Sequence, residues 1–353
     1  MQSIEKTEQL RFESPVFFCA GEPSGDVYAG HYIRLLKEDS PKVVIVGVGG
    51  ACMRMSGADI VMRYEGMTAF GLSDSLAALR THFSLYGKIA RKMLSVKPKT
   101  FVAVAYPGMN LPLCRLAKRR GIKVYYMLPP QIWAWAGFRK HLLKRWADAV
   151  ISFFPFEAGH YKRLGIRTVL SDNLLVDSLG KYVRKNRHKR IGFMPGSRKS
   201  HVTRNLPIAL HLAHSIRRKK PDYDICLIAY GEREARELKS GQDLLRVVYE
   251  GRYQTMKDCD LIITSTGTAS LEAAAMGIPQ IFFHRLSFLD DHVLRRFVKI
   301  REYNLANLYY GEKIVPCYVS SNGNRLCHVL RDAVMGFLQG GSADRLSPNS
   351  IVS

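Results

Sequence analysis

The sequence predicts an α/β protein with two doubly wound domains that face a cleft. Short apolar runs alternate with helix-forming stretches in two series along the 353 residues. Such alternation builds parallel sheets with helices on both faces. A basic segment, 183–190, separates the two series, and turns that contain glycine follow strands in both. We therefore expect an N-terminal domain over 1–182 and a C-terminal domain over 183–353, with the option that the last helix packs back on the N-terminal domain.

The individual elements are expected where apolar runs end at turn residues. The strands of the first series are 15–19, 43–46, 100–105, 124–128 and 149–154, with a helix over 26–37. Those of the second series are 191–194, 224–229, 261–264 and 280–283. Residues 271–276 are strong helix formers, so a helix is expected to begin at Leu271. Ligands of such sheets bind beyond the carboxyl ends of the strands, so the turns at those ends are the candidate sites.

The turn after 261–264 is rich in small polar residues. Thr266, Gly267 and Thr268 let the backbone approach a ligand, and the helix that follows directs free N–H groups and a positive dipole at it. Glu272, one residue into the expected helix, would accept hydrogen bonds from a hydroxylated ligand such as a ribose. The turn predicts a site for a nucleotide diphosphate or a similar polyol phosphate. The alternative is an ordinary strand–helix turn, since a single motif of this kind is weak.

A second turn of the same kind follows 191–194. It contains Gly196, Ser197 and Arg198. The planar fork of an arginine donates two parallel hydrogen bonds to a phosphate, so Arg198 is a candidate ligand of the diphosphate. The alternative is that Arg198 is a solvated loop residue.

The loop at 20–26 places two carboxylates after the first strand. Glu22 and Asp26 are candidate general bases at the cleft edge, while Ser24 is a plausible helix cap. The alternative for Asp26 is that it only caps the helix that follows. Trp133 and Trp135 lie on a loop after a strand, where they would contact a sugar or lipid unless they are packed in the core.

The chain is strongly basic. Lys and Arg number 53 against 30 acidic residues, a net charge of +23. The excess is clustered at 118–120, 139–140, 144–145, 184–190 and 217–220. Such clusters attract phosphates, which nucleic acid, anionic lipid headgroups and phosphorylated small molecules all carry. No nucleic-acid-binding motif is found, and an anionic membrane surface is favoured in view of the resemblance described below. The alternative is that the clusters are only solvated.

Cysteines and apolar runs indicate the class of protein. The seven cysteines are scattered without metal-ligand spacing, as in the reduced core of a cytosolic protein. No apolar run approaches the ~20 residues that cross a bilayer. The polar segment 1–14 is not expected to be a signal peptide.

Taken together, the motifs resemble lipid-A-disaccharide synthase over about 16–330. They are Ala-Gly-Glu-Pro-Ser-Gly-Asp (20–26), Gly-Val-Gly-Gly (47–50), Trp-Ala-Trp (133–135), Phe-Pro-Phe-Glu (154–157), Pro-Gly-Ser-Arg (195–198) and Thr-Gly-Thr-Ala-Ser-Leu-Glu (266–272). The resemblance implies a GT-B fold, in which two Rossmann-like domains hold the sugar nucleotide mainly through the C-terminal one. It implies transfer of 2,3-diacylglucosamine from UDP to 2,3-diacylglucosamine 1-phosphate with inversion. It further implies no metal and no cofactor, because the UDP-sugar is a substrate, and a cytoplasmic, peripheral position at the inner face of the inner membrane.

The resemblance carries roles onto individual residues. Arg198 matches the arginine at the UDP diphosphate, and Asn307 matches the asparagine of the family's Leu-Pro-Asn-Leu segment. The nucleotide-binding turn and helix correspond to Thr266, Gly267, Thr268 and Glu272. The segment 67–83 matches a lipid-facing region, whose apolar side chains are Phe70, Leu72, Leu76, Leu79 and Phe83. An amphipathic core helix is the alternative for this segment.

The acceptor side departs from the family pattern. Ala105 and Gly108 stand where the family's Ile-Asp-Ala-Pro-Asp-Phe-Asn has aspartates, while Pro107 and Asn110 keep the register. The Gly-His-Pro-Leu segment is replaced by residues 172–175, Asp-Asn-Leu-Leu, and the arginine after Trp-Ala-Trp is Ala136.

Three interpretations follow from these departures. The chain is an active transferase that uses Glu22 or Asp26 as base, a related UDP-sugar transferase with another acceptor, or a catalytically silent nucleotide- or lipid-binding paralogue.

Overall fold

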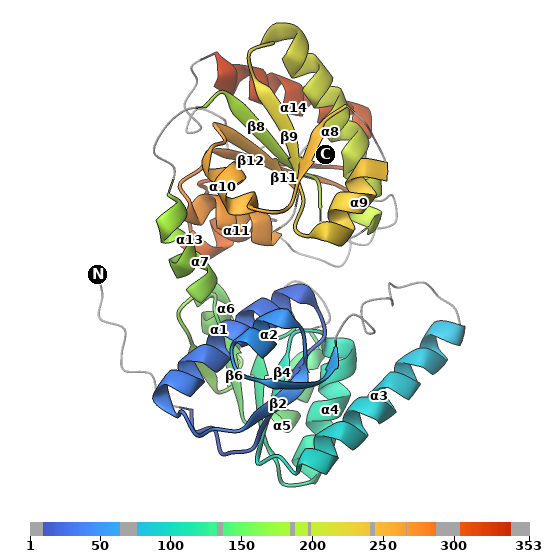
Figure 1. Ribbon diagram of the computed structural model, residues 1–353, viewed down its shortest axis with the longest axis vertical. Helices are drawn as coiled ribbons and strands as arrows, with labels where there is room; N and C mark the ends of the chain where they lie inside the picture. The colour runs from blue at the N-terminus through green and yellow to red at the C-terminus, as the bar shows by residue number, and fades with distance from the viewer. Residues whose placement is uncertain are drawn as a thin grey trace. The chain divides into compact units, whose positions relative to one another are not determined.

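The computed structural model divides the chain into two compact units, Met1–Leu174 and Leu175–Ser353 (Figure 1). It describes residues 10–63, 76–132, 137–183, 188–196, 199–240, 244–265, 267–286 and 304–339. The units divide at 174/175 rather than at 182/183. The last described helix, α14 (Gly323–Leu338), packs on α8 (Lys199–Lys219) within the second unit.

The first unit is a doubly wound parallel sheet of seven strands in the order β3-β2-β1-β4-β5-β6-β7. The strands are β1 (Val16–Ala20), β2 (Ile45–Gly49), β3 (Asp59–Arg63), β4 (Thr100–Val104), β5 (Lys123–Met127), β6 (Ala149–Ser152) and β7 (Thr168–Leu170). Its helices are α1 (Pro23–Asp39), α2 (Ala51–Met55), α3 (Leu76–Val96), α4 (Pro107–Arg119), α5 (Arg139–Trp146) and α6 (Pro155–Arg163). Every residue of β1 and β4 is buried, as expected of central strands covered on both faces.

The second unit is a parallel sheet of six strands in the order β10-β9-β8-β11-β12-β13. The strands are β8 (Arg190–Met194), β9 (Asp224–Ile228), β10 (Arg246–Val248), β11 (Leu261–Thr264), β12 (Gln280–Arg285) and β13 (Cys317–Ser320). Beside α8 and α14, the helices are α7 (Leu174–Leu179), which spans the boundary, the 3₁₀ turn η2 (Gly180–Tyr182), α9 (Glu232–Ser240), α10 (Arg252–Lys257), α11 (Gly267–Ala275) and α13 (Leu305–Tyr310).

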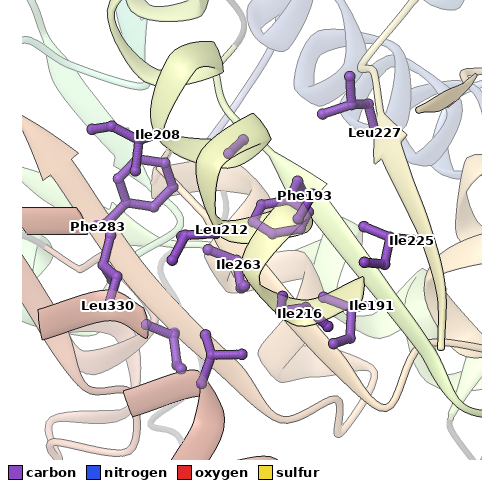
Figure 2. Packing of buried hydrophobic residues seen from close by; sticks show 14 of the residues in the cluster. Ile191, Phe193, Ile208, Leu212, Ile216, Ile225, Leu227, Ile263, Phe283 and Leu330 are labelled. Atoms are coloured by element: carbon purple, nitrogen blue, oxygen red, sulfur yellow. The ribbon is translucent and has the colours of Figure 1, made fainter. Parts of the chain in front are cut away.

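The core of the second unit lies between the sheet and the helices α8, α9 and α14. Figure 2 shows Phe193, Ile263 and Phe283 of the sheet with Ile208 of α8 and Leu330 of α14. All five are at most 2% exposed. Because this core is closely packed, it fixes where β8 and β11 end, and those ends carry the candidate site.

Two expected helix starts were wrong. α1 begins at Pro23, three residues before the expected Asp26, because proline is favoured in the first turn of a helix. α11 begins at Gly267 rather than Leu271. Its first turn is stabilised from outside, since Asn304 donates to the Ser270 hydroxyl at 2.6 Å and Gln280 donates to the Ser270 carbonyl at 2.9 Å. These tertiary contacts override the modest helix propensity of small polar residues.

Candidate active site

The two expected phosphate turns start at one place in the second unit. β8 and β11 are neighbours in the sheet. The next strand after β8 lies toward one edge of the sheet and the next strand after β11 lies toward the other edge, so the gap between the ends of β8 and β11 is the topological switch point. The turn after β8 contains Gly196, and the turn after β11 leads through Ser265 to Gly267. The Ser265 N–H donates to the Met194 carbonyl at 3.0 Å, which joins the two turns at their base.

The side chain of Asn205, in α8, is hydrogen-bonded to both turns. Its side chain is 1% exposed, and its Nδ2 donates to the Pro195 carbonyl at 2.8 Å and to the Ser265 hydroxyl at 3.1 Å. Gly196 has φ +140°, and a Cβ there would lie 2.6 Å from Cβ of His201, so only glycine fits. Asn205 was missed in the sequence because an asparagine inside a helix carries no local signal for such a role.

The expected nucleotide ligands are only partly covered by the described residues. Ser197, Arg198 and Thr266 lie outside them. Gly267 and Thr268 are partly exposed at the start of α11, where free helix N–H groups are expected.

Asn307 is engaged within the fold. It is 4% exposed, its Nδ2 donates to the Val315 carbonyl at 2.9 Å, and its Oδ1 accepts from the Val315 N–H at 2.8 Å. In this conformation its side chain connects α13 to the segment before β13.

Glu272 does not stand free beside the turn. Its side chain is 0% exposed, and Arg252 of α10 forms a two-pronged ion pair with it, at 2.9 Å to Oε2 and 3.0 Å to Oε1. The Tyr253 hydroxyl also donates to Oε1, at 3.3 Å. The expected position one residue into the helix was wrong, since α11 begins five residues earlier. A ribose hydroxyl reaches this carboxylate only if Arg252 or Tyr253 moves aside.

Arg252 is enclosed by two aromatic rings. Its Cζ lies 4.3 Å from the ring centroids of both Tyr230 and Tyr253, a geometry for cation–π attraction. Burial and the negative charge of Glu272 raise the pKa of the Tyr253 phenol, so this hydroxyl remains a donor. The cluster of Tyr230, Arg252, Tyr253 and Glu272 joins α10, α11 and the end of β9, and three of its four members were missed in the sequence.

Glu234 is a buried titratable group beside this cluster. It is 8% exposed on α9 and accepts the Tyr230 N–H at 2.8 Å. Burial raises its pKa from 4.5 to about 7. The carboxyl group of Glu234 therefore binds a proton more tightly in the folded protein than in the unfolded chain.

We expect the free energy of unfolding to fall as pH rises from about 4.5 to about 7, by up to about 3 kcal/mol from this group. Glu234→Gln keeps the acceptor for Tyr230 and removes the charge, so its melting temperature at pH 8 should exceed that of the parent, whereas the two should be close at pH 5. The same difference in melting temperature between the parent and Glu234→Gln at pH 5 and at pH 8 would contradict this expectation.

The first unit has its own switch point, between β1 and β4. The turn after β1 contains Gly21 and Glu22, and the turn after β4 contains Ala105 and Tyr106. A Cβ on Gly21 would lie 2.8 Å from the Tyr106 ring, so the ring packs directly on the first turn. Ala105 and Tyr106 have backbone φ angles of +50° and +41°, values that residues other than glycine rarely adopt. Such strain is typical of functional turns.

The strained turn is held by Asn110. Its Nδ2 donates to the carbonyls of Cys19, Val104 and Ala105 at 3.1, 2.9 and 2.8 Å. The Tyr126 hydroxyl also donates to the Ala105 carbonyl, at 2.8 Å. Pro107 occupies the first turn of α4. The two residues that keep the family register thus hold the backbone.

Asp26 and Glu22 have different surroundings. Asp26 is 3% exposed and accepts the N–H groups of Gly50, Cys52 and Met53 at 2.7, 3.0 and 3.2 Å. It therefore caps α2, not the helix that contains it, and both of its oxygens accept from backbone donors. Glu22 is partly exposed, and its Oε1 accepts from the Ser24 hydroxyl at 3.2 Å.

Tyr106 lies close to the Glu22 carboxylate. Burial and the negative charge of Glu22 raise the pKa of the Tyr106 phenol. Of the two candidate bases, Glu22 is the one with an accessible carboxylate, and Tyr106 is a neighbour of it that the sequence did not reveal.

The remaining expectations fall on other parts of the chain. Trp133, Trp135 and Ala136 lie outside the described residues, as do Phe70 and Leu72. Leu76, Leu79 and Phe83 belong to α3, where Phe83 is 65% exposed. None of the helices in the described ranges combines the length and apolar character of a bilayer-spanning segment. Over the same ranges, His, Cys, Asp and Glu side chains form no group of three or more suited to a metal ion.

Comparison with known families finds a match over nearly the whole chain. Residues 16–329 match the lipid-A-disaccharide synthetase family. Lipid-A-disaccharide synthase of Nitrosococcus oceani is 31% identical over 315 residues, which cover 85% of this chain and 81% of that protein. The corresponding protein of Geobacter sulfurreducens is 28% identical over 316 residues, covering 85% and 82%.

Solved structures share the architecture. The UDP-GlcNAc 2-epimerase of Neisseria meningitidis, bound to UDP-GlcNAc, superposes with a TM-score of 0.61 at 11% identity, covering 91% of each chain. The UDP-GlcNAc 2-epimerase of Methanocaldococcus jannaschii gives 0.59 at 13% identity, covering 93% of each. At these identities the likeness concerns the fold, and the expected GT-B architecture of two Rossmann-like units is confirmed.

Proposed function

The chain belongs to the lipid-A-disaccharide synthetase family, and on this premise we propose that it transfers 2,3-diacylglucosamine from UDP to 2,3-diacylglucosamine 1-phosphate. As a member of that family it is a glycosyltransferase of lipid A biosynthesis. The proposed transfer inverts the anomeric centre and releases UDP. The UDP-sugar is a substrate in this scheme, and no cofactor or metal takes part.

The meeting of two strand-end turns at the switch point of the second unit carries the proposal. Asn205 and the Ser265 N–H hold the turns at fixed spacing, with Gly196 and Gly267 at their tips. We place the UDP diphosphate here, on the N–H groups at the start of α11 and on the guanidinium of Arg198. These groups would stabilise the negative charge that UDP gains as it leaves.

The base in this proposal is Glu22. A sugar hydroxyl that attacks an anomeric carbon must lose its proton, and Glu22 is an accessible carboxylate at the switch point of the first unit. We do not assign this role to Asp26, because its carboxylate accepts three backbone N–H groups. Tyr106 packs on the same turn and would bound the space for the acceptor.

We also propose that the protein attaches peripherally to an anionic membrane surface. Phe83 exposes most of its ring on α3, where it would enter the acyl region. Basic side chains of α4 and α5, which include Arg119 and Arg145, would contact lipid phosphates. This attachment brings the enzyme to lipid substrates on the inner face of the inner membrane.

The test is product formation in detergent micelles. The protein is incubated with UDP-2,3-diacylglucosamine and 2,3-diacylglucosamine 1-phosphate, and the disaccharide is sought by mass spectrometry, with UDP binding measured in parallel. Disaccharide formation that Arg198→Ala abolishes together with UDP binding supports the proposal. No disaccharide from a folded protein that binds UDP would overturn it, and would favour another acceptor or a silent paralogue.

A further inference from the structure

A cavity of about 480 Å³ lies in the second unit, and neither Gly196 nor Gly267 is among the residues that line it. Its walls come from the middle of α8, the end of β12 and the first turns of α14. Ile208 of α8 packs beneath it in the same core cluster as Phe283 of β12, and Figure 2 shows both residues. One wall of the cavity is therefore part of the packed core of the unit.

The charged side chains that line the cavity are of one sign. They are Arg285 and Arg331, with His211 and His328 beside them, and no aspartate or glutamate is among the described lining residues. Asp332, outside the lining, pairs with Arg331 at 3.2 Å and with His328 at 3.4 Å. The charge of Arg285 has no such partner: across the described residues its guanidinium makes no hydrogen bond and no ion pair.

Arg285 lies in an unfavourable electrostatic position. Its guanidinium packs on Gly323, the first residue of α14, where a Cβ would come 3.1 Å from Cζ and 3.2 Å from Nε. The N-terminus of a helix is positive, so it repels a cation placed there. The Asn322 side chain accepts the Arg325 N–H at 3.1 Å, but the first N–H groups, those of Gly323 and Asn324, have no partner within the helix. An anion between the guanidinium and these N–H groups converts the repulsion into two attractions.

We propose that this cavity binds a phosphate ester, with the phosphate between Arg285 and the start of α14. The guanidinium supplies parallel charge-assisted hydrogen bonds, and the helix supplies backbone donors. A phosphate alone leaves most of about 480 Å³ unfilled, so the organic group of the ester extends along Pro207 of α8. The ester is either a soluble compound or the headgroup of an anionic lipid. The site does not depend on the proposed sugar transfer.

The test uses the amide signal of Gly323, a residue that lines this cavity. The full chain is labelled with ¹⁵N-glycine, and the signal is assigned by its loss in Gly323→Ala. Inorganic phosphate is titrated into the parent, into Arg285→Gln and into a control, Arg218→Gln. Arg218 is exposed in the last turn of α8 and lies outside the cavity lining, so it matches the loss of one positive charge.

We expect a saturable shift of the Gly323 signal in the parent and in Arg218→Gln, and an affinity at least about tenfold weaker in Arg285→Gln, the loss of one charge-assisted bond. No shift, or equal affinity in Arg285→Gln, would overturn the proposal.

Sedimentation with vesicles of phosphatidylcholine, with and without phosphatidic acid, then identifies the source of the phosphate. Weaker sedimentation of Arg285→Gln than of Arg218→Gln supports a lipid headgroup. Equal sedimentation with an Arg285-dependent shift supports a soluble ester.

Discussion

Replacing Glu22 by glutamine is expected to lower the rate of disaccharide formation by about 10²–10⁴-fold, the usual contribution of a general base. The change keeps the size of the side chain and its acceptor for the Ser24 hydroxyl, which lies at 3.2 Å. It removes only the basic carboxylate. The initial rate is measured at saturating UDP-sugar, so that it reports on the chemical step. The affinity for UDP is expected to stay unchanged.

Two further variants separate catalysis from folding. Glu38→Gln, an exposed change on the same helix, should leave the rate as it is. Asp26→Asn should mainly lower the melting temperature, because an amide cannot accept all three of the N–H groups that Asp26 accepts. If Glu22→Gln keeps the parent rate, Glu22 is not the base.

Replacing Arg252 by alanine is expected to destabilise the second unit by about 3–5 kcal/mol. Glu272 is 0% exposed, so removal of its partner leaves a buried charge without compensation. The rings of Tyr230 and Tyr253, each 4.3 Å from the guanidinium, lose their packing as well. Hydrogen exchange of the α11 amides measures the free energy of opening in this unit alone.

A matched control is Arg236→Ala. Arg236 also pairs with a glutamate, Glu232 at 3.4 Å, but the side chains are 73% and 65% exposed. Its loss should cost less than about 1 kcal/mol. Adding Glu272→Gln to Arg252→Ala should recover part of the stability, since the unpaired charge is then gone. Equal effects of Arg252→Ala and Arg236→Ala would contradict a structural role for the buried pair.

The central strands could be predicted from the sequence, whereas strands at the sheet edges could not. β1 and β4 are buried throughout and appear as unbroken apolar runs. β3 begins with Asp59 and ends with Arg63, and none of its residues is buried. β10 is only three residues long. A short, partly exposed strand lacks the periodic apolar signal by which strands are recognised, and only its pairing with a neighbour defines it.

The sequence was sufficient to predict which residues lie at the candidate site, but not which residues they pair with. Both glycine turns were located, because their spacing after apolar runs is a local property. Asp26 and Glu272 were recognised as carboxylates near strand ends, but each finds its partners at a distance in the sequence. Asp26 accepts from Gly50, 24 residues away, and Glu272 pairs with Arg252, 20 residues away. Such pairings depend on the folded sheet.

The hydrogen bonds of Asn110 have a consequence for the substitutions that the turn after β4 tolerates. It holds the turn after β4 through backbone carbonyls, so the shape of the turn does not depend on which side chains occupy its tip. A Cβ at Gly108 would meet nothing within 4 Å. A carboxylate can therefore be introduced at position 108 by one substitution, Gly108→Asp, without loss of the fold.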